Sequence, residues 1–187
     1  NSAEEGMERF KGEDKSKLYT RWGNPTFVAA EQTIAALESH GLMNEQGEPL
    51  QLKALLHSSG QAAMTTLFFS NLSAGDTLIS HYSLYGGSQE LMQKVLAEAG
   101  VKIILIDIHD EALLIETITA NPSTKLIHLE TPANPTLQCV DIQAICTIAK
   151  AHGIKVSVDN TVATPYLQQP FALGADFVFH SATKFLN

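Results

Sequence analysis

Basic residues, cysteines and long apolar runs are all scarce in this sequence. Its 187 residues include 12 Lys and Arg against 20 Asp and Glu, and the net charge of -8 argues against a nucleic-acid partner or binding to an anionic membrane. The two cysteines, Cys139 and Cys146, fit neither a zinc pair nor a redox motif, and we expect both to be buried. We find no signal peptide, twin-arginine stretch or long uncharged apolar run, so we expect a cytoplasmic protein.

Two kinds of ligand site also lack their sequence signatures. No expected strand leads into a GxGxxG or P-loop motif, which argues against a dinucleotide or nucleoside triphosphate site. The histidines are scattered, and we assign no metal because no two of the following have ligand spacing on one helix face: His57, His81, His128, His152 and His180.

Short apolar runs alternate with helical patterns over most of the chain. We expect strands at 77–80, 102–107, 125–130, 155–159 and 176–180, with helices at 88–99, 111–120 and 141–151. This α/β alternation predicts a mostly parallel sheet with helices on both faces. Ligands then bind beyond the carboxyl ends of the strands.

The first third of the chain is less regular. Residues 1–17 are polar and suit a short helix or an extended arm, and residues 19–26 are rich in turn residues. Thr26 is the expected N-cap of a helix over 27–39, followed by a loop at 40–51, a short strand at 52–56 and a helix that opens at 58–60 and runs through residue 71. Because nothing covers the last expected strand, we expect the chain to be part of a longer polypeptide.

Lys184 is the most distinctive candidate for chemistry. The run Ser181-Ala182-Thr183-Lys184 places two hydroxyls and an amine directly after an expected strand, where the sheet can aim them into a crevice. A lysine in this position is well placed to form an imine. Taken alone, the run is more often an exposed lysine that opens a surface loop.

Two other segments offer partners for a cofactor. Asp159 ends the preceding strand, and its carboxylate suits the protonated pyridine nitrogen of pyridoxal 5′-phosphate (PLP); it also suits an N-cap or a turn. At the start of the helix near residue 60, the N–H groups of Gly60 and Gln61 would face an anion. An ordinary serine N-cap explains that segment equally.

The sequence resembles the cystathionine γ-lyase and methionine γ-lyase family, whose enzymes of cysteine and methionine metabolism use PLP. Six blocks carry the resemblance and occur in the family's order over nearly the whole chain. They are Tyr19-Thr20-Arg21…Gly23-Asn24-Pro25-Thr26, Ser59-Gly60, Leu84-Tyr85-Gly86-Gly87-Ser88, Glu130-Thr131-Pro132-Ala133-Asn134-Pro135-Thr136, Val158-Asp159-Asn160-Thr161 and Ser181-Ala182-Thr183-Lys184.

The resemblance implies a role for each site residue. Lys184 would hold PLP as a Schiff base and shuttle protons, Asp159 would hold the pyridinium, and Asn134 would lie near the phenolic oxygen. Tyr85 would stack on the cofactor ring and help to activate the incoming amino acid, although a packed turn residue is its simpler interpretation. The implied phosphate ligands are Gly60, Gln61, Ser181 and Thr183.

The resemblance also implies a shared active site. Tyr19 and Arg21 would reach the phosphate of the neighbouring protomer in a homodimer, itself half of a homotetramer; otherwise Arg21 is a solvated charge near Glu13 or Asp14. Residues 1–40 would then be an N-terminal arm and first helix. Residues 41–187 would be the PLP-binding α/β domain, the large domain of the type I PLP-dependent fold, without its C-terminal partner domain.

Two features depart from the family pattern. Residues 41–49 look like a surface insertion, and position 87 is Gly where methionine-specialised γ-lyases have Cys. We therefore expect a C–S lyase or γ-replacement enzyme such as a cystathionine γ-lyase, β-lyase or γ-synthase. The alternatives are a methionine γ-lyase or O-acylhomoserine sulfhydrylase, a PLP enzyme of other chemistry such as an aldolase or aminotransferase, and a non-catalytic binding protein. The resemblance implies that the arginine that binds the substrate carboxylate would come from a C-terminal domain beyond residue 187.

Overall fold

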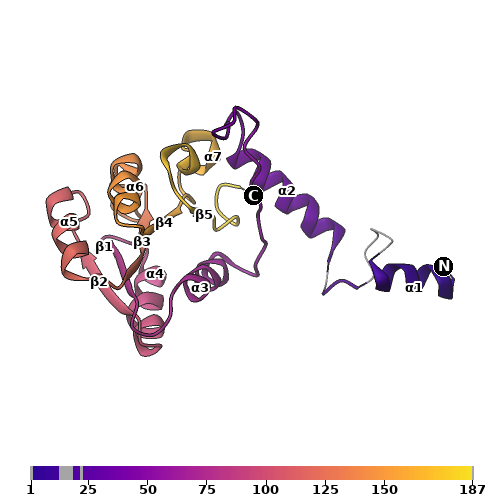
Figure 1. Ribbon diagram of the computed structural model, residues 1–187, viewed down its shortest axis with the longest axis horizontal. Coiled ribbons are helices and arrows are strands. Elements are labelled where there is room, and N and C mark those ends of the chain that lie inside the picture. The colour runs from indigo at the N-terminus through magenta and orange to yellow at the C-terminus, as the bar shows by residue number, and fades with distance from the viewer. Residues whose placement is uncertain (1, 13–18, 22, 187) are drawn as a thin grey trace. The chain divides into compact units, whose positions relative to one another are not determined.

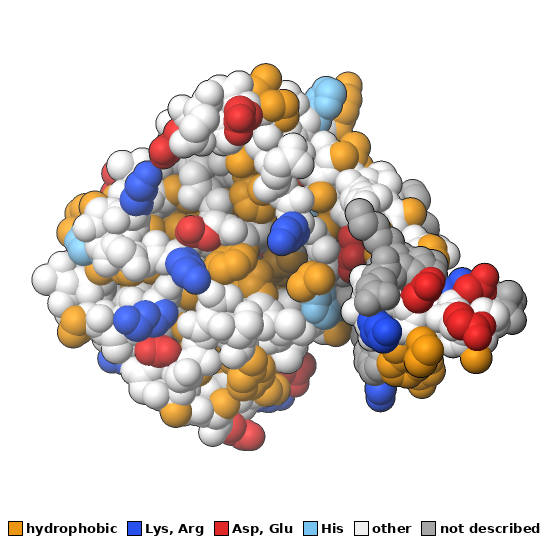
Figure 2. Space-filling model, turned by 45° about the vertical axis from the view of Figure 1, so that its right-hand side comes forward, with side chains coloured by type: hydrophobic (Ala, Val, Ile, Leu, Met, Phe, Trp, Pro, Cys, Tyr) orange, Lys and Arg blue, Asp and Glu red, His pale blue; other side chains and the backbone are white. Residues whose placement is uncertain are grey.

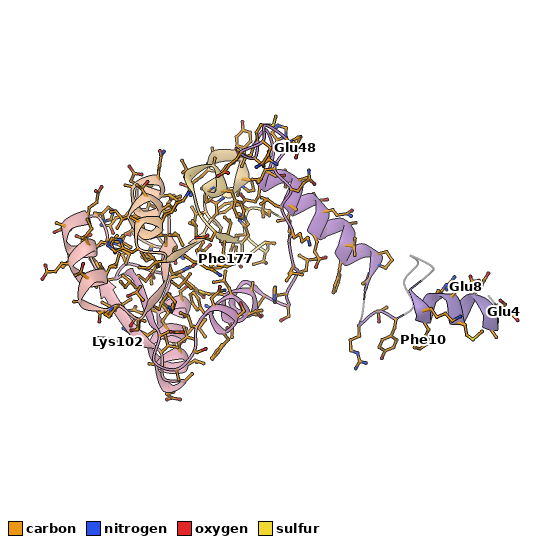
Figure 3. The ribbon with its side chains drawn as sticks, viewed as in Figure 1. Glu4, Glu8, Phe10, Glu48, Lys102 and Phe177 are labelled. Carbon is orange, nitrogen blue, oxygen red and sulfur yellow. The ribbon has the colours of Figure 1, made fainter. Side chains whose placement is uncertain are left out.

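A computed structural model describes residues 2–12, 19–21 and 23–186, and the chain forms two compact units, Asn1–Leu56 and His57–Asn187. In the first unit, α1 (Ala3–Lys11) begins with a capping box, in which Ser2 and Glu5 each accept the other's backbone N–H. The helix has no buried residue, and Phe10, labelled in Figure 3, is exposed. The predicted division at residue 40 stays a prediction.

The second helix of this unit, α2 (Pro25–Glu38), starts earlier than predicted. Asn24 is its N-cap, because the Asn24 side chain accepts the N–H of Thr26, so the prediction of Thr26 as the cap is wrong. Pro25 suits the first helical position, where no N–H is needed. The expected insertion at 41–49 folds into a tight turn, with the side chain of Asn44 accepting the N–H groups of Gln46 and Glu48.

The predicted strand at 52–56 is wrong, since this segment pairs with no strand. Its side chains do alternate between partly buried and exposed. Alternation is a property of one segment, whereas a strand also needs a neighbouring backbone to pair with.

The second unit holds a five-stranded, fully parallel sheet (Figure 1), which confirms the predicted α/β class. The strands follow the order β2-β1-β3-β4-β5. Their bounds are β1 Thr77–His81, β2 Lys102–Ile106, β3 Thr124–Glu130, β4 Lys155–Asp159 and β5 Phe177–Phe179. Lys102, labelled in Figure 3, opens β2, and its Nζ donates to Oδ1 of Asn121 at 2.7 Å.

Helices cover both faces of this sheet, as predicted. On one face α5 (Glu111–Ala120) and α6 (Ile142–Ala151) pack on Ile79, Ile127 and Val156; on the other, α3 (Gly60–Asn71) packs with Leu78 and Leu126 (Figure 1). Neighbouring residues of one strand thus serve opposite cores. The remaining helical elements are α4 (Gly86–Glu90), which continues as the π-helical η1 (Leu91–Leu96), α7 (Thr164–Leu167) and the 3-10 helix η2 (Pro170–Leu173).

Within the described ranges, no helix is both long and apolar enough to cross a bilayer. Lys and Arg side chains are interspersed with Asp and Glu on the face drawn in Figure 2. Cys146 is buried as predicted, but Cys139 is exposed, because it lies in the loop after β3 rather than in α6.

Candidate active site

The strand order places a topological switch point between β1 and β3. The chain leaves β1 toward β2 on one side and returns to β3 on the other, so the connections diverge at the carboxyl ends of β1 and β3. Ligands of open α/β sheets bind at such points. Tyr85 follows β1 here, and Glu130 is the last residue of β3.

Glu130 bridges this switch point. Its Oε2 accepts the N–H of Tyr85 at 2.9 Å, and its Oε1 accepts the N–H of Asn134 at 2.7 Å. The side chain is buried, and burial raises the pKa of Glu130, as does the nearby Asp159, while the two N–H bonds oppose the rise. Glu130 therefore fixes the backbone of two predicted site residues. Only the three-dimensional fold reveals this role, because the sequence does not show which N–H groups the carboxylate reaches.

Gly87 gives the Tyr85 ring its space. A Cβ atom at Gly87 would lie 2.6 Å from Cε1 of Tyr85 and would overlap the side-chain amide nitrogen of Gln61. Tyr85 and Gln61, predicted from separate motifs, thus meet beside one glycine. The ring of Tyr85 is half exposed and open to a ligand.

The two predicted phosphate segments also meet. A Cβ atom at Gly60 would lie 2.8 Å from Cβ of Ser181, so this close approach requires glycine. Ser59 caps α3 by accepting the N–H of Ala62 at 3.1 Å. The N–H groups of Gly60 and Gln61 belong to the first turn, outside the helix's own hydrogen-bond ladder, and are available to an anion at the positive end of the helix.

Asp159 lies at the carboxyl end of β4, next to β5. Its Oδ1 accepts the N–H of Thr161 at 2.9 Å, so the predicted turn role is also present. Burial raises the pKa of Asp159, although its bonds to Thr161 and the nearby His180 oppose the rise. In the described part of the chain no Lys or Arg forms an ion pair with this carboxyl. The site therefore holds a desolvated acid suited to an incoming cation.

The segment after β5 forms a turn directly beside this acid. The N–H of Ser181 donates to Oγ1 of Thr161 at 2.9 Å, and the N–H of Lys184 donates to the carbonyl of Ser181 at 3.0 Å. Thr183 and Lys184 are exposed. Lys184 and Ser181 thus share the carboxyl edge of the sheet with Asp159.

A buried polar pair lies beneath the site. Nδ1 of His128 is 2.9 Å from Oγ of Ser157, one strand away, and both residues are two positions before Glu130 and Asp159 on their strands. Phe68 meets the imidazole edge-on and Phe179 stacks on it. Burial lowers the pKa of His128 to about 3, so the ring is neutral and part of the core.

The remaining predicted residues lie in the other unit. The guanidinium of Arg21 lies 5.3 Å from the ring centroid of Tyr19, and both side chains are exposed. Glu13 and Asp14, the alternative neighbours of Arg21, lie outside the described residues. The predicted reach of Tyr19 and Arg21 to a neighbouring protomer stays a prediction.

The family model for Cys/Met metabolism PLP-dependent enzymes matches residues 1–187. The chain belongs to this family. It is 41% identical over 189 aligned residues to L-methionine gamma-lyase of Treponema denticola, and 44% identical over 178 to cystathionine beta-lyase of Lactococcus lactis subsp. cremoris. These alignments include 100% and 94% of this chain but only 44% and 43% of the relatives. The chain thus spans less than half the length of these family members.

A solved structure confirms the fold assignment within the family. Cystathionine gamma-lyase from Lactobacillus plantarum, solved in complex with L-serine, is 42% identical to this chain, with a TM-score of 0.80 over 90% of this chain and 40% of that one.

The residues present fit the family's cofactor. PLP needs an acid for its ring nitrogen, donors for its phosphate, a flat partner for its ring and a lysine. Asp159 is a carboxyl without a Lys or Arg partner among the described residues. A side chain at position 60 would fill the space between Gly60 and Ser181. These two features suit the ring and phosphate ends of PLP respectively.

Proposed function

We propose that this chain carries the PLP site of a C–S lyase or γ-replacement enzyme of sulfur amino acid metabolism. The proposal rests on one observation above the others: residues from separate sequence blocks meet at the carboxyl edge of one sheet. Gly60 contacts Ser181, Tyr85 and Gln61 meet beside Gly87, and Asp159 is linked through Thr161 to Ser181. When bound, PLP supplies an electron sink for carbanions formed on amino acids.

The residues of this chain would bind and orient the cofactor. Asp159 holds a proton on the ring nitrogen, and Tyr85 packs its ring against the cofactor. Asn134 would lie near the phenolic oxygen. The phosphate is held by the N–H groups of Gly60 and Gln61 and the hydroxyls of Ser181 and Thr183.

Lys184 would hold the cofactor through its amine and carry protons between substrate carbons once the amino acid has displaced it. Its position on a turn that the Ser181 carbonyl closes and the Ser181 N–H anchors to Thr161 supports this role, because these bonds hold the backbone while the long, exposed side chain can move. Tyr85, whose backbone N–H is held by Glu130, would help to remove the proton of the incoming amine.

A methionine γ-lyase or an O-acylhomoserine sulfhydrylase is the second candidate. The relatives' names include both methionine and cystathionine lyases. Gly87 favours the cystathionine enzymes, because a cysteine there would need the space now filled by Tyr85 and Gln61. Hydrogen sulfide, thiol and 2-oxo acid release by the full-length protein from cystathionine, cysteine, methionine and O-acetylhomoserine would separate these activities.

Borohydride reduction of the PLP-loaded, full-length protein followed by peptide mapping tests the cofactor site. We expect a pyridoxyl group on Lys184 and its loss in Lys184→Ala. Lys155→Ala is the matched control. Lys155 begins β4, at the end of the strand opposite to Asp159, and its Nζ donates to Asn71, so the label should remain in this variant. A label on another lysine would disprove the assignment, and absence of any label would favour a non-catalytic protein.

We further propose a homodimer that shares its active sites, assembled as a homotetramer, and a cytoplasmic location. The exposed pair Tyr19 and Arg21 supports the shared site, because a guanidinium and a phenol are suitable phosphate ligands. The two cysteines are both free, which suits a reducing compartment.

A further inference from the structure

His81, Asp107 and His109 form a cluster at the carboxyl ends of β1 and β2, on the same edge of the sheet as Asp159 but separated from β4 by β3. His81 is the last residue of β1, while Asp107 and His109 directly follow β2, its edge neighbour. One ligand atom from each residue lies within 4.8 Å of the other two. The sequence did not suggest this cluster, because the residues come from two strand ends rather than one helix face.

The partners of the two imidazoles decide which nitrogen carries the proton. Nε2 of His81 is 3.3 Å from Oε1 of Gln138, and Nε2 of His109 is 3.2 Å from the carbonyl oxygen of Cys139. Both oxygens only accept, so each Nε2 is the donor. In a neutral imidazole the other nitrogen, Nδ1, then carries a lone pair.

The surroundings of Nδ1 of His81 favour the same tautomer. The N–H of Ile108 donates to this nitrogen at 3.3 Å. The carbonyl oxygen of Ile106 also lies 3.1 Å from Nδ1 and could accept a proton from it. A proton on Nδ1 would, however, face the N–H of Ile108, and the unprotonated Nε2 would face the oxygen of Gln138. With Nδ1 unprotonated, its lone pair and the nearby Ile106 oxygen together make the electrostatic potential beside Nδ1 of His81 negative.

The two lone pairs meet a carboxylate there. Oδ1 of Asp107 is 2.9 Å from Nδ1 of His109 and 3.9 Å from Nδ1 of His81. Two of these acceptors already receive a backbone N–H, from Ile108 to Nδ1 of His81 at 3.3 Å and from His109 to Oδ1 of Asp107 at 3.2 Å. A cation between the three groups, either a proton on His109 or a metal ion, would neutralise the negative potential that remains.

We propose that His81, Asp107 and His109 form a binding site for a divalent transition metal ion, with Zn²⁺ as the best match. Two imidazoles and a carboxylate are a common donor set for Zn²⁺, and histidine ligands usually donate their second N–H to a carbonyl or carboxylate, as both do here. Zn²⁺ with bonds of about 2.0–2.2 Å holds tetrahedral ligands roughly 3.4 Å apart. The distances of Oδ1 of Asp107 from the two Nδ1 atoms, 2.9 and 3.9 Å, lie on either side of this value, and all three ligand atoms lie within 4.8 Å of one another, so rotation of the exposed side chains would bring them to an ion.

The exposure of the cluster provides an entry path. The side chains of Asp107 and His109 are 49% and 39% exposed, whereas His81 is buried. An ion would thus enter from solvent, bind against a rigid strand end and keep an open position for water.

The ion would also brace the loop that carries Asn134. Gln138 and Cys139, which orient the two imidazoles, belong to the segment after β3, and the carbonyl of Gln138 accepts the N–H of Ala133. The site joins the end of β2 to this loop, so we assign it a structural role beside the active site.

Calorimetric titration of Zn²⁺ into the PLP-loaded, full-length protein, in chelator-treated buffer, tests this site. We expect one ion per chain beyond any taken up by the cofactor, and visible absorption of a nitrogen–oxygen donor set when Co²⁺ replaces Zn²⁺. His109→Asn and Asp107→Asn each remove an exposed ligand and should abolish this binding. His152→Asn is the matched control, since His152 is an exposed histidine at the end of α6.

Gln138→Leu tests whether the hydrogen bond that orients His81 supports metal binding. Loss of a hydrogen-bond partner behind a metal ligand weakens binding by roughly 10- to 100-fold, so this variant should bind Zn²⁺ more weakly than the wild type but not lose it. Circular dichroism of every variant confirms that it folds. No uptake by the wild-type protein, or equal affinity in the wild type, His109→Asn and Asp107→Asn, would overturn the proposal and assign the cation to a proton.

Discussion

Glu130 and Asp159 are register partners at the carboxyl ends of the adjacent parallel strands β3 and β4. Burial raises the pKa of both carboxyl groups, but their hydrogen bonds differ. Glu130 already accepts two backbone N–H groups from different loops, whereas among the described residues the side chain of Asp159 is bonded to Thr161 of its own turn. The carboxylate of Glu130 is thus occupied by the backbone of Tyr85 and Asn134, and Asp159 is the acid available to a cofactor.

Glu130→Gln should loosen the bridge between Tyr85 and Asn134. Glutamine keeps one carbonyl oxygen but sets an N–H group against the other backbone N–H, and an unsatisfied buried group costs roughly 1–3 kcal/mol. We expect a lower unfolding free energy, together with weaker PLP binding and a changed circular dichroism of the bound cofactor. A purely structural role would leave the cofactor spectrum unchanged at full occupancy. Glu90→Gln is the control, because Glu90 is exposed and forms an ion pair with Lys94 on its own helical segment.

Asp159→Asn should separate cofactor binding from stability. Since the folded pKa of Asp159 lies above its ordinary value, the carboxyl stabilises the fold only at low pH, and that contribution is lost as pH rises through the folded pKa. In cofactor-free protein at pH 7 the variant should therefore unfold with a higher free energy than the wild type, and its Oδ1 can still accept the N–H of Thr161. Near pH 3 the difference should vanish.

PLP affinity should move in the opposite direction, because Asn cannot hold the ring nitrogen protonated. Denaturant unfolding without cofactor and absorbance titration with PLP measure the two effects. A variant that is less stable at pH 7 and binds PLP normally would contradict the role of Asp159.

Local pattern predicted most of the sheet, and β4 was predicted residue for residue. Strand ends and Ser59 as a cap follow from short-range chemistry, which one sequence records. The segment 52–56 shows the limit, because its alternation matches a strand but its partner would have to come from elsewhere in the fold. The π-helical turn at 91–96 likewise lay within a helix predicted as regular, since side-chain periodicity does not reveal the hydrogen-bond register.

The candidate site likewise combines residues that local sequence patterns indicate with residues that only the fold brings together. Lys184, Asp159 and Gly60 could be proposed from the sequence because they lie at or shortly after strand or helix ends, where the order of elements already places them. Glu130 lies 45 residues from Tyr85 in the chain, and His109 is brought to His81 by strand pairing. Such relationships depend on the register between strands, which single-sequence patterns do not contain.

His128 should give the protein an acid-sensitive core. Its folded pKa of about 3 lies below the ordinary value of 6.5, so between these pH values the unfolded chain binds a proton that the folded chain does not. Its contribution to the unfolding free energy is therefore lost as pH falls through this window, at up to about 1.4 kcal/mol per pH unit. His128→Asn keeps an acceptor for Ser157 and should flatten this slope. His152→Asn, at an exposed histidine, should not; equal slopes in all three proteins would contradict the assignment.

Gly87→Ala and Gly86→Ala form a matched pair in the first turn of α4. A Cβ at Gly87 overlaps Gln61 and crowds Tyr85, whereas a Cβ at Gly86 meets no atom within 4 Å. Gln61 and Tyr85 would have to move to make room for this Cβ, so Gly87→Ala should displace two residues of the proposed site and weaken PLP binding. Gly86→Ala should bind PLP normally and gain slightly in stability from its better helix propensity. Equal PLP affinity in both variants, measured by absorbance titration, would show that residue 87 does not shape the site.

Hybrid oligomers test whether the active site is shared. Arg21→Ala and Lys184→Ala homo-oligomers should both be nearly inactive in the full-length protein. Loss of a charged contact to a buried phosphate costs roughly 2–5 kcal/mol by analogy with truncated charge pairs at interfaces. Mixing the two variants should restore activity, because one site of each hybrid dimer then combines an intact Lys184 with an intact Arg21 from its neighbour.

The reciprocal hybrid makes this test decisive. When wild-type protomers are mixed with protomers that carry both substitutions, a shared site predicts that neither site of the hybrid is complete, since the intact Lys184 faces a neighbour without Arg21. If Arg21 instead serves its own chain, the wild-type protomer of that hybrid keeps full activity and the hybrid of single variants stays inactive. Tagging the two protomers differently and purifying the hybrids by both tags removes the parent oligomers from the assay. Activity in the single-variant hybrid and its loss in the reciprocal hybrid therefore identify a site built from two subunits, and the opposite pattern rejects it.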